Sequence, residues 1–211
     1  MSTTPATEAE PVEHPPTAAT PRSGRGWLAW AGLLLPLAAI AVFVAVETLR
    51  PAAEEATIGA AATEFELADT AGGTQSLERA LAEGEQGALL YFSMGVGCGG
   101  CFAQIPEIEP ALTARGIRLV SVVVDDPEIA RIEAERYGAT TPLALDPDRS
   151  VSEAYGMLGV YGHGDRPSHS FVSIDADGTI TDVQHYAEMF VPLDQLLADL
   201  DLADLDLSDQ T

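Results

Sequence analysis

The chain contains only two cysteines, and both belong to one Cys-Gly-Gly-Cys motif at residues 98–101. An apolar run of strand length, residues 88–94, precedes the motif, and a helix pattern over residues 101–114 follows it. A disulfide-stabilised scaffold would need more cysteines at wider spacing, and a four-ligand zinc site would need two further ligands. A Cys-x-x-Cys motif at a strand-to-helix junction instead favours a redox-active pair in an α/β fold.

Strand and helix patterns alternate along residues 64–200, which predicts one α/β domain with a central mixed sheet flanked by helices. Residues 47–63, rich in Ala and Glu, are expected to be a tether, and residues 201–211 an acidic tail that frays. The expected strands cover residues 65–67, 88–94, 117–125, 143–145, 170–174 and 179–185, and the expected helices cover residues 77–83, 101–114, 127–137, 151–155 and 192–200.

The N-terminal part of the chain predicts a membrane anchor. Residues 1–26 are rich in Pro, Thr, Ala and Glu without apolar periodicity, and we expect them to be disordered. Residues 27–46 carry no charge and have the length, about 20 residues, that spans a bilayer as a helix. A cleaved signal peptide is the alternative, but its apolar region would be shorter. The run therefore predicts a single transmembrane helix that acts as a signal anchor.

Charged residues beside this helix predict its orientation. Arg22 and Arg25 precede it, whereas Arg50 on the other side is offset by Glu47. By the positive-inside rule the N-terminus is expected in the cytoplasm and the domain outside the cell membrane. The net charge of −23 repels nucleic acid phosphates, so no nucleic acid partner is expected.

The spacing of the two cysteines suggests different tasks for them. Cys98 is expected at the N-terminus of a helix, where backbone N–H groups and the helix dipole lower the pKa of a thiol. Cys101 is expected one turn further in, shielded but within reach of Cys98. Cys98 would then attack a substrate disulfide as the nucleophile, and Cys101 would resolve the mixed disulfide. The disulfide itself would be the redox group, with no cofactor.

A metal-binding pair is the alternative reading of the motif. Only His163, His169 and His185 could complete such a site, and none of them is in a paired spacing with the cysteines. No metal is therefore expected, although a metal-binding module without enzymatic activity remains an alternative.

A series of landmarks runs along the chain, at residues 65–69, 72, 77, 88–92, 98–101, 123–125, 137–138, 146–148, 155–156, 171–175 and 177–178. On these landmarks, residues 64–200 resemble the thioredoxin-like superfamily, and within it the alkyl hydroperoxide reductase/thiol-specific antioxidant (redoxin) branch, which includes membrane-anchored extracytoplasmic thiol–disulfide oxidoreductases. This resemblance implies protein or small-molecule thiols and disulfides as partners, together with a redox partner at or outside the membrane.

Three positions depart from the patterns of the superfamily. Peroxidatic enzymes of this branch carry Pro and then Thr or Ser where this chain has Tyr91 and Gly95. Thioredoxins proper carry a buried Asp where this chain has Phe92. The resemblance therefore implies disulfide exchange, with an atypical thiol peroxidase as the alternative, and any proton relay must use another group.

The resemblance also implies a cis-proline opposite the cysteine pair, which would dock substrate chains. Pro167 is the natural candidate, but it lies further from Asp175 than in the usual pattern. His169 could occupy the expected position instead, and it could tune the thiolate or shuttle a proton. Alternatively, His169 is a strand-edge residue whose ring is satisfied by a hydrogen bond.

Overall fold

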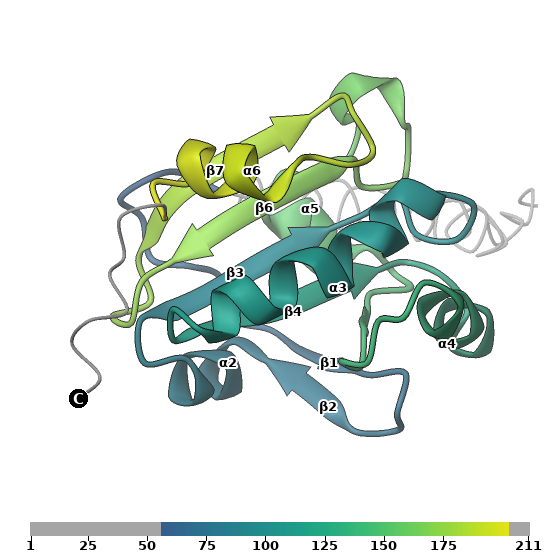
Figure 1. The fold of residues 1–211 in the computed structure, drawn as a ribbon, viewed down its shortest axis with the longest axis horizontal. Coiled ribbons are helices and arrows are strands. Elements are labelled where there is room, and N and C mark those ends of the chain that lie inside the picture. Colours follow the sequence, from purple (N-terminus) through teal and green to yellow (C-terminus); the bar gives the residue numbers. More distant parts are fainter. Residues whose placement is uncertain (1–55, 203–211) are drawn as a thin grey trace, which may run out of the picture. The chain divides into compact units, whose positions relative to one another are not determined.

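A five-stranded mixed sheet forms the centre of the computed structural model, which describes residues 56–202 (Figure 1). The strand order is β5-β4-β3-β6-β7. Strands β3, β4 and β5 run parallel to one another, β6 pairs antiparallel with β3, and β7 pairs antiparallel with β6. The expected α/β fold with a mixed sheet is thereby confirmed. The strands are β3 (Gly87–Phe92), β4 (Ile117–Val123), β5 (Ala144–Leu145), β6 (His169–Ile174) and β7 (Ile180–Tyr186).

Helices cover both faces of this sheet, because its central strands are apolar on both sides. Leu89 and Tyr91 of β3 belong to one core cluster, whereas Leu90 and Phe92 belong to the other. Strand β3 is consequently buried at every residue. The first cluster takes in α3 (Gly99–Thr113), α4 (Pro127–Arg136) and α6 (Leu193–Asp199), and the second takes in α2 (Leu77–Glu83) and α5 (Ser150–Ala154).

Two small elements were not expected from the sequence. They are strand β2 (Thr74–Ser76) and a short 3-10 turn at Val160–Gly162. Strand β2 forms a separate antiparallel hairpin with β1 (Glu66–Ala68), the strand expected at residues 65–67. Strand β2 has only three residues, Thr-Gln-Ser, and they carry no apolar alternation that would predict a strand.

The folded domain begins earlier than residue 64. Residues 56–63, expected to be part of the tether, are hydrogen-bonded to the domain: the Gly59 N–H donates to the Ile180 carbonyl at 2.8 Å. The Tyr155 hydroxyl donates to the Thr63 carbonyl at 2.7 Å. The expectation of a free tether is therefore wrong for these residues, because an irregular segment can still satisfy its backbone groups against a strand.

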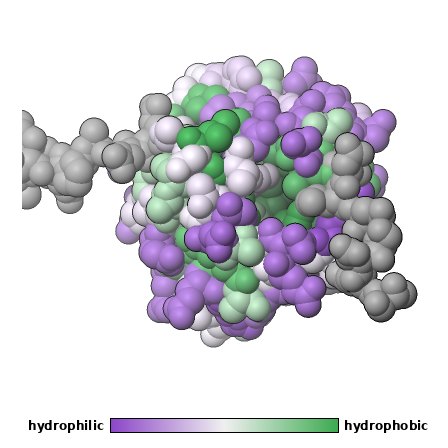
Figure 2. Space-filling model, turned by 90° about the vertical axis from the view of Figure 1, so that its left-hand side faces the viewer, coloured by the Kyte–Doolittle hydropathy of each residue, from purple (hydrophilic) through white to green (hydrophobic). Residues whose placement is uncertain are grey.

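The C-terminal boundary also shifts by two residues. Leu202, expected in the fraying tail, is 8% exposed, and its carbonyl accepts a hydrogen bond from Arg115 Nε at 3.1 Å. Figure 2 looks at the end of the domain where β3 begins, and hydrophilic residues cover much of that surface, in keeping with the acidic composition.

The predicted disordered segment, residues 1–26, and the predicted transmembrane helix, residues 27–46, lie outside the described residues, as does the tail beyond Leu202. Between residues 56 and 202, none of the helices combines the length and the apolar character that a bilayer crossing requires.

We predict that Leu89→Ala destabilises the oxidised domain by about 2–5 kcal/mol, because Leu89 is 0% exposed at the centre of β3 and its truncation leaves a cavity. Urea unfolding of the full chain measures this loss. Ile132→Ala on α4 is the control, since Ile132 is 46% exposed and its truncation should change the free energy of unfolding by less than about 0.5 kcal/mol. Equal effects of the two substitutions would contradict the placement of Leu89 in the core.

Candidate active site

Cys98 and Cys101 lie where strand β3 leads into helix α3, and they form a disulfide with a Cα–Cα distance of 5.3 Å. Cys98 is the N-cap residue of α3, and the Cys101 N–H points to its sulfur at 3.3 Å. Cys98 is 6% exposed and Cys101 is 0% exposed. Cys98 is thus the more accessible of the two, as a nucleophile at a helix N-terminus would need to be. Their catalytic roles remain predictions.

A loop between β7 and α6 lies against the pair. The Met189 sulfur is 3.9 Å from the Cys101 sulfur, and the Met189 carbonyl would be 2.5 Å from a Cβ atom at Gly100. Gln104 of α3, fully buried, fixes this loop through two hydrogen bonds with the Val191 backbone, of 3.0 and 2.7 Å. The close approach explains why the second residue between the cysteines is Gly.

An ion pair holds the loop that precedes Cys98. Asp125, two residues after β4, accepts hydrogen bonds from Arg166 Nη2 and from the Val96 N–H, each at 2.8 Å. Arg166 Nη1 also donates to the Met94 carbonyl. The hydrogen bond with Asp125 raises the pKa of Arg166, so the guanidinium stays charged. These contacts form a clamp, in which Asp125 and Arg166 connect the segment after β4 and the segment before β6 to the loop that precedes Cys98.

This clamp was not foreseen from the sequence, although Asp125 was noted as a family landmark. The Asp at the end of the apolar run, Asp125, was the available signal, because such a carboxylate must find a partner when it is buried. Its partner, Arg166, lies 41 residues further along the chain, and nothing local in the sequence connects them.

Gly95 has no room for a side chain. Its φ is +74°, and a Cβ atom there would be 1.7 Å from Asp125 Oδ2. A non-glycine residue would therefore require both a strained backbone and displacement of the carboxylate. This is the position at which peroxidatic enzymes of the resembled branch carry Thr or Ser.

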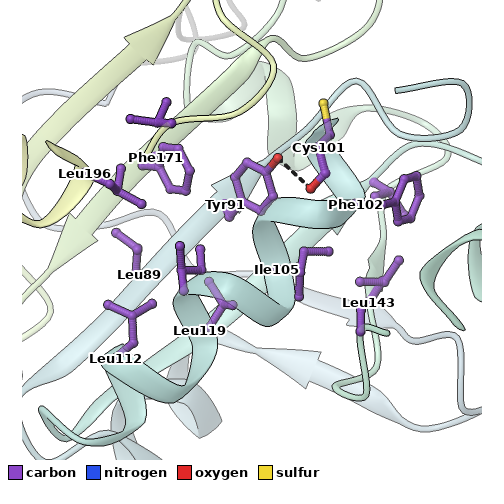
Figure 3. Packing of buried hydrophobic residues seen from close by; sticks show 14 of the residues in the cluster. Leu89, Tyr91, Cys101, Phe102, Ile105, Leu112, Leu119, Leu143, Phe171 and Leu196 are labelled. Carbon is purple, nitrogen blue, oxygen red and sulfur yellow. Dashed lines mark hydrogen bonds between the residues drawn. The ribbon is translucent and has the colours of Figure 1, made fainter. Parts of the chain in front are cut away.

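Tyr91 lies under the disulfide and joins it to β6. Its hydroxyl donates to the Cys101 carbonyl at 3.0 Å and lies 2.9 Å from His169 Nδ1 (Figure 3 shows the first of these bonds). Both rings are 0% exposed. Burial raises the pKa of Tyr91 and lowers the pKa of His169 to about 4, so both groups are neutral near pH 7.

The structure therefore brings His169 to the pair through Tyr91. Strand β6 lies between β3 and β7, and His169 is its first residue. In the sequence, Tyr91 stands only as a departure from the peroxidatic pattern. The hydrogen bond of its hydroxyl to the Cys101 carbonyl gives this departure a structural role.

The expectation of a cis-proline at residue 167 is wrong. Among the described residues no peptide bond is cis, so the Arg166–Pro167 bond is trans. Pro167 is buried, and it forms an isolated bridge with Leu158. The cis bond that the resemblance implied at this position is absent.

The other two histidines of residues 56–202, His163 and His185, have contacts elsewhere. His185 Nδ1 lies 2.8 Å from the Ser170 hydroxyl, and His163 caps the 3-10 turn. Across residues 56–202, no three His, Cys, Asp or Glu side chains are grouped so that they could hold a metal ion.

Comparison with known sequences gives a consistent family. The model of the AhpC/TSA family matches residues 58–183. A Mycobacterium tuberculosis protein named as a peroxiredoxin is 32% identical over 136 residues, which cover 61% of this chain and 85% of that protein. The thiol-disulfide oxidoreductase ResA of Halalkalibacterium halodurans is 29% identical over 132 residues, which cover 61% of this chain and 68% of ResA.

Solved structures show the same fold. Peroxidoxin BcpB from Mycobacterium tuberculosis superposes with a TM-score of 0.56 at 23% identity, covering 68% of this chain and 96% of that one. A Chlorobium tepidum protein titled as thiol:disulfide interchange protein DsbE gives a TM-score of 0.55 at 22% identity, covering 71% of this chain and 99% of that one.

The buried His169 predicts a specific pH dependence of stability. Its pKa is about 4 in the folded chain against an ordinary 6.5, so between these values only the unfolded chain binds the proton. The stability that neutral His169 contributes is complete above pH 6.5 and falls by up to roughly 3 kcal/mol as the pH drops to 4. The free energy of unfolding of wild type minus that of His169→Asn should therefore shrink over this range in urea titrations. A difference that stays constant with pH would show that the imidazole is not held neutral.

Proposed function

The chain belongs to the AhpC/TSA family and is an oxidoreductase, and on this basis we propose that its Cys98–Cys101 pair exchanges disulfides with protein or small-molecule thiols. The exchange needs a nucleophilic thiolate, a second thiol within bonding distance and an accessible face. Cys98 at the N-terminus of α3, Cys101 in its first turn and the difference in their exposure support these three requirements.

The proposal rests on what occupies positions 91 and 95, where peroxidatic enzymes of the resembled branch carry Pro and then Thr or Ser. The Asp125 carboxylate occupies the space that a side chain at Gly95 would take. Tyr91 replaces the peroxidatic Pro, and its hydroxyl is bound to the Cys101 carbonyl. Both positions are thus used to hold the loop and the helix that carry the cysteines, which favours exchange within the pair over binding of peroxide.

The reaction has two balanced steps. In the reduced enzyme the Cys98 thiolate attacks one sulfur of a substrate disulfide, forms a mixed disulfide and releases one substrate thiolate. The Cys101 thiolate then attacks the Cys98 sulfur, so that the Cys98–Cys101 bond forms and the second substrate thiolate leaves. Two electrons pass from the pair to the substrate, and the reverse sequence oxidises a dithiol.

Apolar side chains around the pair suit a protein or aromatic thiol substrate. Met94, Val96, Tyr137 and Met189 are all partly exposed and pack against the core beside the cysteines. They can bury the apolar part of a substrate while its sulfur meets Cys98.

We further propose that residues 27–46 anchor the chain in the cell membrane with the domain outside the cytoplasm. The uncharged run and the Arg residues before it support this arrangement. The thiol or disulfide that recharges the pair would then belong to a redox partner in the membrane or beyond it.

A thiol peroxidase is the second candidate, because a relative that is 32% identical carries the name peroxiredoxin. It differs from the main proposal in one measurable reaction, the reduction of hydrogen peroxide by Cys98.

We predict that Cys101→Ser accumulates mixed disulfides with substrates, because the nucleophile remains and the resolving thiol is gone, whereas Cys98→Ser accumulates none. Non-reducing electrophoresis with mass spectrometry of the trapped species gives the readout. The double variant controls for disulfides formed elsewhere. Equal trapping by both single variants would overturn the assigned roles. Consumption of peroxide by reduced wild type as fast as its exchange with a model disulfide would favour the second candidate.

For the anchored chain, protease added to intact spheroplasts should digest the domain, while a cytoplasmic marker protein stays whole. Removal of residues 1–46 should release the domain from the membrane fraction. Full protection of the domain in spheroplasts would reverse the orientation that we assign.

A further inference from the structure

The Tyr91 hydroxyl lies between two groups that constrain its single proton. The Cys101 carbonyl can only accept a hydrogen bond, so the hydroxyl donates to it at 3.0 Å. His169 Nδ1, at 2.9 Å from the same oxygen, must then donate rather than accept. The hydrogen bonds therefore run in one direction, from His169 to Tyr91 and from Tyr91 to Cys101.

This direction fixes the tautomer of His169. The hydrogen is on Nδ1, and Nε2 keeps a free lone pair in the neutral ring. Nε2 is buried and has no hydrogen-bond partner within the described part of the chain. Leaving one ring nitrogen unsatisfied costs free energy, and the compensating contact of the ring is the hydrogen bond from Nδ1 to Tyr91.

Aromatic packing holds both rings in the orientation that this chain of hydrogen bonds needs. Tyr91 stacks on Phe171 with ring centroids 4.6 Å apart, and His169 meets Phe171 edge-on at 5.2 Å. Tyr91 and Phe171 are also directly paired between β3 and β6. Two central strands thus jointly hold the first turn of α3.

From this arrangement we infer that Tyr91 and His169 are positioning residues that hold Cys101 ready to resolve the mixed disulfide, an inference that rests on the proposed exchange function. While the disulfide is closed, the S–S bond itself keeps the two residues together. When Cys98 is instead bonded to a substrate, that constraint is gone. The hydrogen bond from Tyr91 to the Cys101 backbone does not involve either sulfur. It therefore remains in the mixed disulfide, the state in which the Cys101 sulfur must reach the Cys98 sulfur.

A chromogenic disulfide separates the two steps of exchange. Reduced enzyme attacks dithiobis(nitrobenzoate) through Cys98, and one thionitrobenzoate leaves as the mixed disulfide forms. Cys101 then attacks Cys98, and the second thionitrobenzoate leaves as the intramolecular disulfide closes. Stopped-flow absorbance of the released thionitrobenzoate gives a rate for each step.

Tyr91→Phe removes the hydroxyl and keeps the ring. We expect the first release to keep its rate within about twofold, because Cys98 is untouched, and the second to slow by about tenfold or more. Loss of one hydrogen bond corresponds to about tenfold in rate, and a displacement of about 1 Å at a reacting group to about a hundredfold.

Two variants of His169 test the direction of the hydrogen bonds. His169→Asn places an amide N–H near the position of Nδ1 and should keep the second rate within about threefold of wild type. His169→Leu has no donor and should slow the second release as Tyr91→Phe does. If the Tyr91→Phe/His169→Leu double variant is no slower than either single variant, the two residues act as one unit.

Tyr155→Phe is the matched control. Tyr155 is 1% exposed and also donates a hydrogen bond to a backbone carbonyl, that of Thr63 at 2.7 Å, but it belongs to the opposite core cluster. It reproduces the loss of a buried tyrosine hydroxyl without touching the pair, and both of its release rates should match wild type.

The outcomes separate this inference from the proposed function. Cys101→Ser should release one thionitrobenzoate, and wild type should release two. If wild type releases one, the exchange function itself fails. If wild type releases two while Tyr91→Phe resolves as fast as Tyr155→Phe, the exchange function stands and the positioning role is overturned. A slowed second release in both tyrosine variants would also overturn it, since general loosening of the fold would then explain the effect.

Discussion

The burial of strand β3 on both faces is the constraint on which the rest of the structure depends. Its alternating side chains anchor two separate cores, so helices must pack on each side of the sheet. The strand ends at Phe92, and the chain then turns through a short loop into α3, which places both cysteines at the end of the central strand. The redox pair therefore follows a strand that is buried at every residue.

Around this strand the site is assembled from segments that are distant in sequence. Asp125 and Arg166 clamp the loop before Cys98, Gln104 fixes the loop that brings Met189 to Cys101, and Tyr91 ties the first turn of α3 to the sheet. The contacts of Gln104 and Tyr91 are buried hydrogen bonds, and the Asp125–Arg166 ion pair is part-buried. Breaking a buried hydrogen bond would leave a polar group unsatisfied.

Much of the fold could be predicted because its signals are local. The helix expected at residues 77–83 matches α2, and the strands at 88–94 and 117–125 match β3 and β4 to within two residues. The short β2 and the docking of residues 56–63 escaped prediction, because neither depends on periodicity. Strand β2 pairs with β1, and residues 56–63 bind backbone groups of Gly178 and Ile180, so both depend on partners outside their own segment. The Arg166–Pro167 bond is trans although the motif pattern implied a cis bond, and Pro167 is bridged to Leu158.

The sequence by itself determined the fold class and the place of the cysteine pair, since apolar periodicity and a Cys-x-x-Cys at a strand-to-helix junction are properties of neighbouring residues. Only the tertiary structure decided what surrounds the pair. His169 meets Tyr91 across 78 residues of chain, and Arg166 meets Asp125 across 41. No local pattern in the sequence predicts these contacts. They form when long-range strand pairing brings polar side chains into a low-dielectric interior, where each must find a partner.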